Sequence, residues 1–341
     1  MFKKVALENF GPIPILKWDG LANINLVIGA NATGKTFLLK LMYAVHKSLE
    51  EFGRGNDQRG LDEILSSRLF WTFQESKIGN LVQRGKPSIK ADLAFTDQGH
   101  LRFEFGKDVQ KKIPIINNSI VASSRPFQNH AIFLPAKEVL SLQHVILKSR
   151  DQDSVFGFDD TYVDLARVLT QPPTRGRNLD EFASARKRLA KELHGKLKFD
   201  DQQKLWRFQN NQNQLFEIGA TAEGIKKLAI LDVLLGNRYL DKNSVVFIDE
   251  PETALHPSAI IHFLETISEL SKLGMQFCLA THSYFVIKKL FLIAQQQKCS
   301  IPTLIFGPES GITQADLRDD MPENSIIDES VRLYEQQLEL V

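Results

Sequence analysis

The stretch from Gly29 to Thr36 has the residue types and the spacing of a loop that binds phosphate groups. It matches the pattern GxxxxGK(S/T) at every constrained position and reads Gly29-Ala30-Asn31-Ala32-Thr33-Gly34-Lys35-Thr36. Glycines are needed where the backbone turns tightly or approaches oxygen, and the backbone N–H groups of such a loop surround the phosphates. We expect Lys35 to reach the β- and γ-phosphates and the Thr36 hydroxyl to coordinate Mg²⁺. This predicts a nucleoside triphosphate site that extends to Phe37, the next residue.

The elements on either side of this loop fit that function. The short run Asn25-Leu26-Val27-Ile28 stops at Gly29, as a buried strand that enters a phosphate loop does. The stretch from Phe37 to Val45 is apolar on most of its surface and predicts a helix packed on both sides. Because this helix starts near Gly34, the positive end of its dipole points to the phosphates. Residues 5–10, 13–18 and 24–29 predict three strands.

Two carboxylates far along the chain are placed to act on the same ligand. The apolar run Val245-Val246-Phe247-Ile248 ends in Asp249 and Glu250. Such a run is typical of a buried parallel strand, and ligands bind beyond the carboxyl ends of these strands. We expect Asp249 to hold Mg²⁺ directly or through water, and Glu250 to orient or deprotonate the attacking water.

A histidine follows the next predicted strand. The apolar stretch from Gln276 to Ala280 ends in Thr281-His282-Ser283. Most lone histidines are structural, but the end of the strand after the acidic one is within geometric reach of a γ-phosphate. His282 is therefore a candidate for contact with that phosphate.

These motifs together resemble the ATPase heads of the RecF/SMC/ABC class. The resemblance rests on Gly29–Thr36, on Asp249-Glu250-Pro251-Glu252 with Ala254-Leu255-His256-Pro257 behind it, and on Thr281-His282-Ser283. Within that class the chain resembles the small AAA-like ATPases of the OLD/RecF-related group, often found in bacterial antiphage or toxin–antitoxin modules. The resemblance covers most of the chain. It implies an α/β fold, that of a P-loop NTPase with an ABC-type ATPase head, a mixed central sheet, an antiparallel β subdomain and a helical insertion.

The resemblance also implies roles for single residues. Lys35 and Thr36 become the phosphate and Mg²⁺ residues, Asp249 the Walker B acid, Glu250 the general base and His282 the switch histidine. ATP rather than GTP is implied by the resemblance alone. Ala254–Pro257 corresponds to the D-loop at a subunit interface.

Two further family segments have candidates here. The signature segment, which contacts ATP on the partner subunit, corresponds to Ala220–Lys227, with Gly224 as the nucleotide contact; an ordinary loop before a helix is the alternative. Ala222 and Glu223 depart from the usual Ser-Gly-Gly pattern. For the Q-loop glutamine, Gln74 and the neighbourhood of Pro135–Glu138 stay open.

Length alone predicts two domains, but the resemblance favours one ABC-type domain over residues 1–341. Its parts are expected to be an N-terminal lobe with the phosphate loop and a β subdomain (1–134), a helical insertion (135–215), and a lobe with the signature, Walker B acid and switch histidine (216–341).

Charge is unevenly distributed although the net charge is only +1. Residues 171–210 carry a net charge of +5, which a solvated helical face or a nucleic-acid or partner surface would each explain. Residues 316–341 carry −6, and residues 330–340 predict a terminal amphipathic helix. The two cysteines give neither a disulfide framework nor a zinc pattern. With no signal-peptide pattern and no apolar run long enough for a membrane span, we expect a cytoplasmic protein without a membrane partner.

The class that the chain resembles hydrolyses ATP in a dimer, so the resemblance implies an ATP-sandwich homodimer or higher oligomer. About 58 residues follow Ser283, which is short for the C-terminal nuclease domain of larger OLD-type relatives. We therefore expect an ATPase that regulates a separate effector such as a nuclease or toxin, with antiphage defence as its setting. The alternatives are an ATP-gated scaffold with negligible turnover and a RecF-like DNA-repair ATPase that binds DNA.

Overall fold

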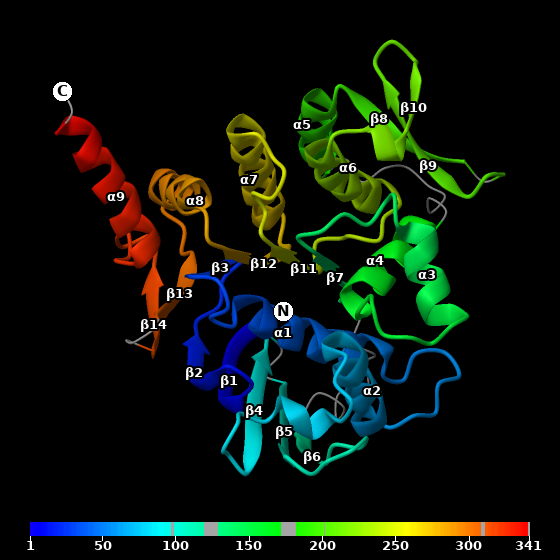
Figure 1. Ribbon diagram of the computed structural model, residues 1–341, viewed down its shortest axis with the longest axis vertical. Coiled ribbons are helices and arrows are strands. Elements are labelled where there is room, and N and C mark those ends of the chain that lie inside the picture. The colour runs from blue at the N-terminus through cyan, green and yellow to red at the C-terminus, as the bar shows by residue number, and fades with distance from the viewer. Residues whose placement is uncertain (97–98, 119–128, 172–181, 201, 308–310, 340–341) are drawn as a thin grey trace.

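A six-stranded sheet runs through the middle of the molecule and separates two packed layers (Figure 1). The computed structural model describes residues 1–96, 99–118, 129–171, 182–200, 202–307 and 311–339. The strands of the sheet, in spatial order, are β14 (Gly311–Asp316), β13 (Pro302–Gly307), β3 (Ile24–Gly29), β12 (Gln276–Thr281), β11 (Val245–Asp249) and β7 (Ala131–Leu134).

Five of these strands are parallel neighbours and only β14 runs antiparallel, so the sheet is mixed as expected. Strands β3, β11 and β12 are apolar almost throughout because helices cover both faces of the sheet. Alternate residues of one strand enter different cores: Leu26 and Ile28 belong to one cluster and Val27 to the other. Helix α1 (Lys35–Glu51) covers the face of the sheet on which Val27 lies. Helices α7 (Pro257–Lys272) and α8 (Tyr284–Gln297) cover the opposite face (Figure 1).

The predicted antiparallel β subdomain packs below α1. Its order is β2 (Ile13–Asp19), β1 (Phe2–Phe10), β4 (Ser88–Phe95), β5 (His100–Gly106) and β6 (Ile115–Asn118). A left-handed Gly11 makes the turn between β1 and β2, and β4 and β5 form an antiparallel hairpin. The helix α2 (Leu61–Phe73) and the short η1 (Ile78–Leu81) complete this lobe.

The helical insertion is predicted correctly only in its first part. Residues 135–193 hold α3 (Gln143–Asp151), α4 (Asp160–Leu169) and α5 (Ala183–Leu193), but the helical expectation for residues 194–215 is wrong. Helix α5 ends at a left-handed His194, and β8 (Gly195–Asp200), β9 (Leu205–Asn210) and β10 (Leu215–Glu217) then form a small antiparallel sheet. The cause is a two-residue alternation: Trp206 and Phe208 are buried on β9, while Leu205 is exposed and Arg207 is half-buried.

The C-terminal third returns to the central sheet. A short turn, η3 (Ile218–Ala220), leads to α6 (Glu223–Gly236), which runs beside α5. The last helix, α9 (Ser325–Leu338), projects from the body, and none of its side chains, all described, is buried (Figure 1). It begins five residues before the predicted 330 because the Asn324 side chain caps the N–H groups of Ile326 and Ile327.

Within the described ranges, none of the helices is long and apolar enough to cross a membrane.

Cys278 is fully buried on β12, and burial raises the pKa of its thiol well above the usual range. The division of the chain at residues 134 and 215 stays a prediction.

Candidate nucleotide site

The predicted phosphate loop, the two carboxylates Asp249 and Glu250, and His282 lie at one edge of the central sheet. Strand β12 lies between β3 and β11, all three parallel, and the registers pair Thr281 with Ile28 and Asp249 with Ala280. The phosphate loop, the two carboxylates and His282 therefore leave the sheet side by side although they are far apart in sequence.

The phosphate loop has the backbone geometry that its glycines permit. Gly29 has a φ of 148° and Gly34 a φ of 106°, both in the region that disfavours other residues. A Cβ on Gly29 would lie 2.5 Å from the carbonyl oxygen of Phe306, and one on Gly34 would lie 2.9 Å from Cγ of Pro12. At both positions the loop therefore packs against neighbouring segments too closely to accommodate a side chain.

Lys35 stands at the start of α1 and is 8% exposed. Its ammonium donates to the carbonyl oxygens of Gly29 (2.8 Å) and Ala30 (2.6 Å), which hold it inside the loop. Burial lowers its pKa, although the charges of Asp249, Glu250 and Glu252 oppose that shift. A cation that is partly desolvated in this way favours an anionic ligand.

Thr36 and Asp249 form a contact pair with the chemistry of a magnesium site. The Thr36 hydroxyl lies 3.0 Å from both carboxylate oxygens of Asp249. Burial raises the pKa of Asp249, the Thr36 hydrogen bond counteracts it, and the Glu250 charge adds to it. A carboxylate and a neighbouring hydroxyl supply the oxygen ligands that a hard divalent cation prefers.

Glu250 lies next to His282 at the mouth of the site. Its Oε1 is 3.5 Å from Nδ1 of His282, and its Oε2 accepts a hydrogen bond from the Thr253 hydroxyl at 3.0 Å. Both side chains are partly exposed, 34% for Glu250 and 42% for His282. They can therefore contact a ligand that enters from solvent.

Glu252 holds the histidine loop, a role that the sequence reasoning missed. One of its carboxylate oxygens accepts from the Thr281 hydroxyl (2.7 Å) and from the backbone N–H of His282 (3.3 Å). The position of Glu252 two residues after Glu250 is the only signal in the sequence, and it does not reveal this contact.

A pocket of about 460 Å³ opens beside the phosphate loop, and this volume is within the range of small-molecule sites. Residues Asn31–Phe37, Asp249 and Glu250 line it, whereas Gly29, Ala30 and His282 are not among its lining residues. Lys40 and Asp159 were missed: they line the pocket and form an ion pair at 2.6 Å. The signal for Lys40 was available, since it follows Thr36 by one helical turn.

Of the two Q-loop candidates, Gln74 lines this pocket, where its Oε1 accepts from the Gly157 N–H at 3.1 Å. Residues 135–138 instead border a separate small cavity together with Lys226 and Lys227. Lys227 was not singled out from the sequence. It donates to the Glu250 carbonyl at 2.7 Å, and burial lowers its pKa to about 8 against the opposing charges of Glu252, Asp249 and Glu250.

Gly224 lies apart from the pocket. It sits in the first turn of α6, buried, and a Cβ there would be 2.8 Å from the Ala254 carbonyl oxygen. Its assignment as a nucleotide contact on a partner subunit stays a prediction. Among the described residues, no group of three or more His, Cys, Asp or Glu side chains could hold a metal ion.

Comparison with solved structures finds similarity to SMC head domains. An SMC head, crystallised bound to the C-winged helix domain of ScpA, aligns over 92% of this chain and 97% of its own, with a TM-score of 0.55 and 12% identity. The SMC head domain from Thermotoga maritima aligns over 92% of this chain and 98% of its own, with a TM-score of 0.47 and 12% identity. At this identity the first likeness shows the fold, that of a P-loop ATPase head.

Sequence comparisons agree on the class. RecF, the DNA replication and repair protein, from two strains of Lactococcus lactis subsp. cremoris is 26% identical over 99 residues, which is 29% of this chain. This match spans only a quarter of the length of those RecF proteins. The family model described as "AAA domain, putative AbiEii toxin, Type IV TA system" matches residues 24–288, which include every predicted site residue. The chain therefore belongs to this family, as an ABC- and RecF/SMC-like AAA ATPase related to toxin–antitoxin modules.

Proposed function

We propose that this protein binds ATP with Mg²⁺, hydrolyses it, and dimerises around it to regulate a separate effector protein. The observation that carries the proposal is the grouping of Lys35, the Thr36–Asp249 pair and Glu250 around one pocket, with His282 beside Glu250. Membership in a toxin–antitoxin-related family supports a nuclease or toxin as the effector and antiphage defence as the setting.

The chemistry follows from the position of each group. The loop N–H groups and Lys35 bind the phosphates, and Thr36 and Asp249 hold the metal. Bound Mg²⁺ neutralises charge that develops on the phosphate oxygens. Glu250 accepts a proton from the attacking water, and His282, whose Nδ1 lies 3.5 Å from Oε1 of Glu250, contacts the terminal phosphate. Gln74 lines the same pocket, which supports it over residues 135–138 as the Q-loop glutamine.

Hydrolysis is tested by phosphate release from the wild type and from Glu250→Gln, with nucleotide binding measured in parallel. Glu250→Gln keeps the size of the side chain and its contact with Thr253 but removes the base. We expect ATP binding within about threefold of wild type and phosphate release lowered by at least about a hundredfold. Equal release from both proteins would refute the role of Glu250. Tight binding without release by the wild type would favour the scaffold.

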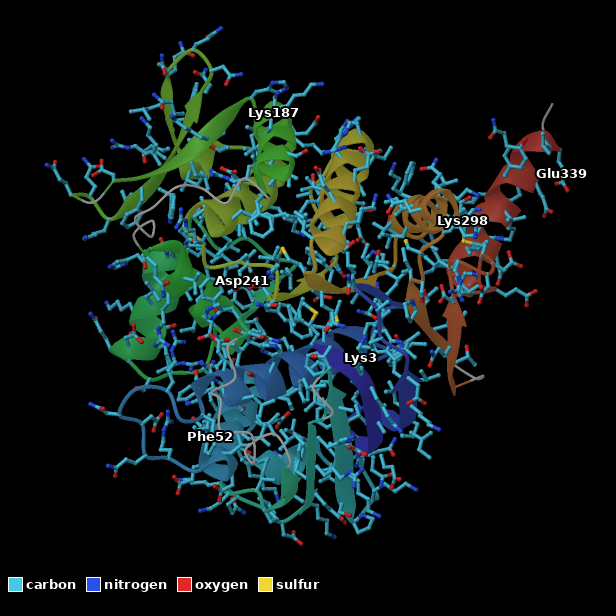
Figure 2. All side chains as sticks on the ribbon, turned by 180° about the vertical axis from the view of Figure 1, so that it is seen from behind. Lys3, Phe52, Lys187, Asp241, Lys298 and Glu339 are labelled. Carbon is cyan, nitrogen blue, oxygen red and sulfur yellow. The ribbon has the colours of Figure 1, made fainter. Side chains whose placement is uncertain are left out.

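A second candidate function is DNA binding of the RecF kind, and one surface favours it. Lys187 and Lys191 on α5 and Lys196 and Lys198 on β8 are all exposed. Figure 2 shows Lys187 at the outer end of α5, far from Glu339 in the acidic C-terminal region. Arg186 and Arg188 of the same basic segment are instead held by Asp232 and Glu265.

These ion pairs decide which variant tests DNA binding. Reversing Lys187, Lys191, Lys196 and Lys198 removes charge without breaking an observed ion pair, whereas reversing Arg186 or Arg188 also breaks the packing of α5. Loss of salt-sensitive binding to a DNA duplex in the lysine variant would support this function. No binding by the wild type at low salt would eliminate it.

A further inference from the structure

The turn that follows the acidic strand is held in an unusual conformation. Glu250 has a φ of 47° and Ala254 a φ of 63°, although neither is glycine. Residues other than glycine adopt such values only where the surroundings hold them there. The turn also carries the carboxylate proposed to activate water, so whatever holds it sets the direction of that carboxylate.

The first turns of α6 contact both of these residues. The Lys227 ammonium donates to the carbonyl oxygen of Glu250 at 2.7 Å, and the Thr253 N–H donates to the same oxygen at 3.0 Å. On the same helix face, one turn earlier, Gly224 packs so closely that a Cβ would lie 2.8 Å from the Ala254 carbonyl and 3.0 Å from the Leu255 side chain. Helix α6 thus touches both ends of the strained turn.

The neighbouring lysine has no such contact. Lys226 is just as buried, but its ammonium binds Ser141 at 3.1 Å and Glu223 at 2.7 Å, on another side of α6. Lys227 is 9% exposed, and the carboxylates of Glu252, Asp249 and Glu250 are the charges that act on it. A buried ammonium kept beside these groups fits a role in fixing the turn.

We propose that Lys227 is a positioning residue that links the start of α6 to the catalytic carboxylate Glu250. This inference rests on the proposed function, in which the start of α6 meets ATP held by the partner subunit. A shift of α6 on meeting that ATP moves the Lys227 ammonium and with it the Glu250 carbonyl. The two ATP sites of a dimer are then coupled. In each subunit α6 contacts the ATP held by the partner, and the same helix holds the catalytic carboxylate Glu250 of its own site.

Lys227→Met tests the link, since it keeps the length and apolar stem of the side chain but removes the donor. We expect its kcat to fall at least about tenfold while KM and the affinity for ATP stay within about threefold of wild type. Lys227→Arg retains a donor and is expected to recover most of the lost kcat. The Hill coefficient for ATP, above 1 in the wild type, is expected to fall to about 1 in Lys227→Met.

Asp232→Asn is the matched control. It removes another contact of α6, the ion pair with Arg186, at a distance from the turn. A loss of kcat in Asp232→Asn equal to that in Lys227→Met, at equal thermal stability, would mean that loosening α6 is sufficient and would overturn the inference. So would a normal kcat in Lys227→Met, or a wild-type Hill coefficient of 1. Absence of phosphate release from the wild type itself would instead defeat the proposed function.

Discussion

Glu252 offers a sharp test of how the site positions His282. Its carboxylate, 12% exposed, accepts hydrogen bonds from the Thr281 hydroxyl and from the His282 N–H. Hydrogen bonds to a charged group contribute about 1.5–3 kcal/mol, and neutral ones about 0.5–1.5 kcal/mol. Glu252→Gln can keep both bonds but loses their charge, which should cost about 2 kcal/mol for the two together. Glu252→Ala loses both bonds and leaves the buried Thr281 hydroxyl without this acceptor.

If this free energy is expressed in the transition state, kcat should fall about thirtyfold in Glu252→Gln and about a hundredfold or more in Glu252→Ala. ATP binding, which depends on the phosphate loop, should change by less than about threefold. The assay is phosphate release under saturating ATP with Mg²⁺, together with nucleotide affinity by titration. A kcat in Glu252→Ala close to wild type would refute the claim that these bonds position His282. Loss of ATP binding would show that Glu252 acts on the phosphate loop instead.

Other outcomes follow from the same contacts. Lys35→Met should abolish detectable ATP binding by titration calorimetry while leaving the melting temperature within a few degrees. Arg68→Met should lower the free energy of unfolding in urea by about 3 kcal/mol, because Asp160 and Asp164 are buried and lose a shared cation, although Arg150 and the Tyr43 hydroxyl still contact them. An effect below about 1 kcal/mol would contradict this. Burial lowers the pKa of His46 to about 3, so below about pH 6.5 the unfolded state gains a proton that the folded state does not. Stability should therefore fall by about 2 kcal/mol from pH 7.5 to pH 5, and urea unfolding of His46→Gln should show a flatter profile.

The sequence was sufficient where function constrains neighbouring residues. The phosphate loop, the Asp249–Glu250 strand end and the strands beside them could be predicted because each is a local pattern with a physical reason. The mixed sheet and the antiparallel lobe were implied by the family resemblance. The order β3-β12-β11, which brings these motifs to one edge, is shown by the structure.

The sequence did not predict the structure where a strand contains many polar residues. It also did not predict contacts between segments that are far apart along the chain. In β8, Lys196 and Lys198 alternate with Leu197 and Phe199, and the charged residues made the stretch look like a solvated helix. The ion pair between Lys40 and Asp159 and the hydrogen bond from Lys227 to the Glu250 carbonyl form only because the fold brings separate helices and turns together. Spacing along the chain gives no information about such pairs.

The central claim, that two copies close around ATP at this site, is tested most directly by the mass of Glu250→Gln in solution. Light scattering should report a monomer without nucleotide and a dimer or larger assembly with ATP and Mg²⁺. The assembly should persist because the variant cannot hydrolyse the ATP that holds it, while the wild type releases phosphate and returns to the smaller form. A mass that does not change with ATP, together with no phosphate release from the wild type, would contradict the account.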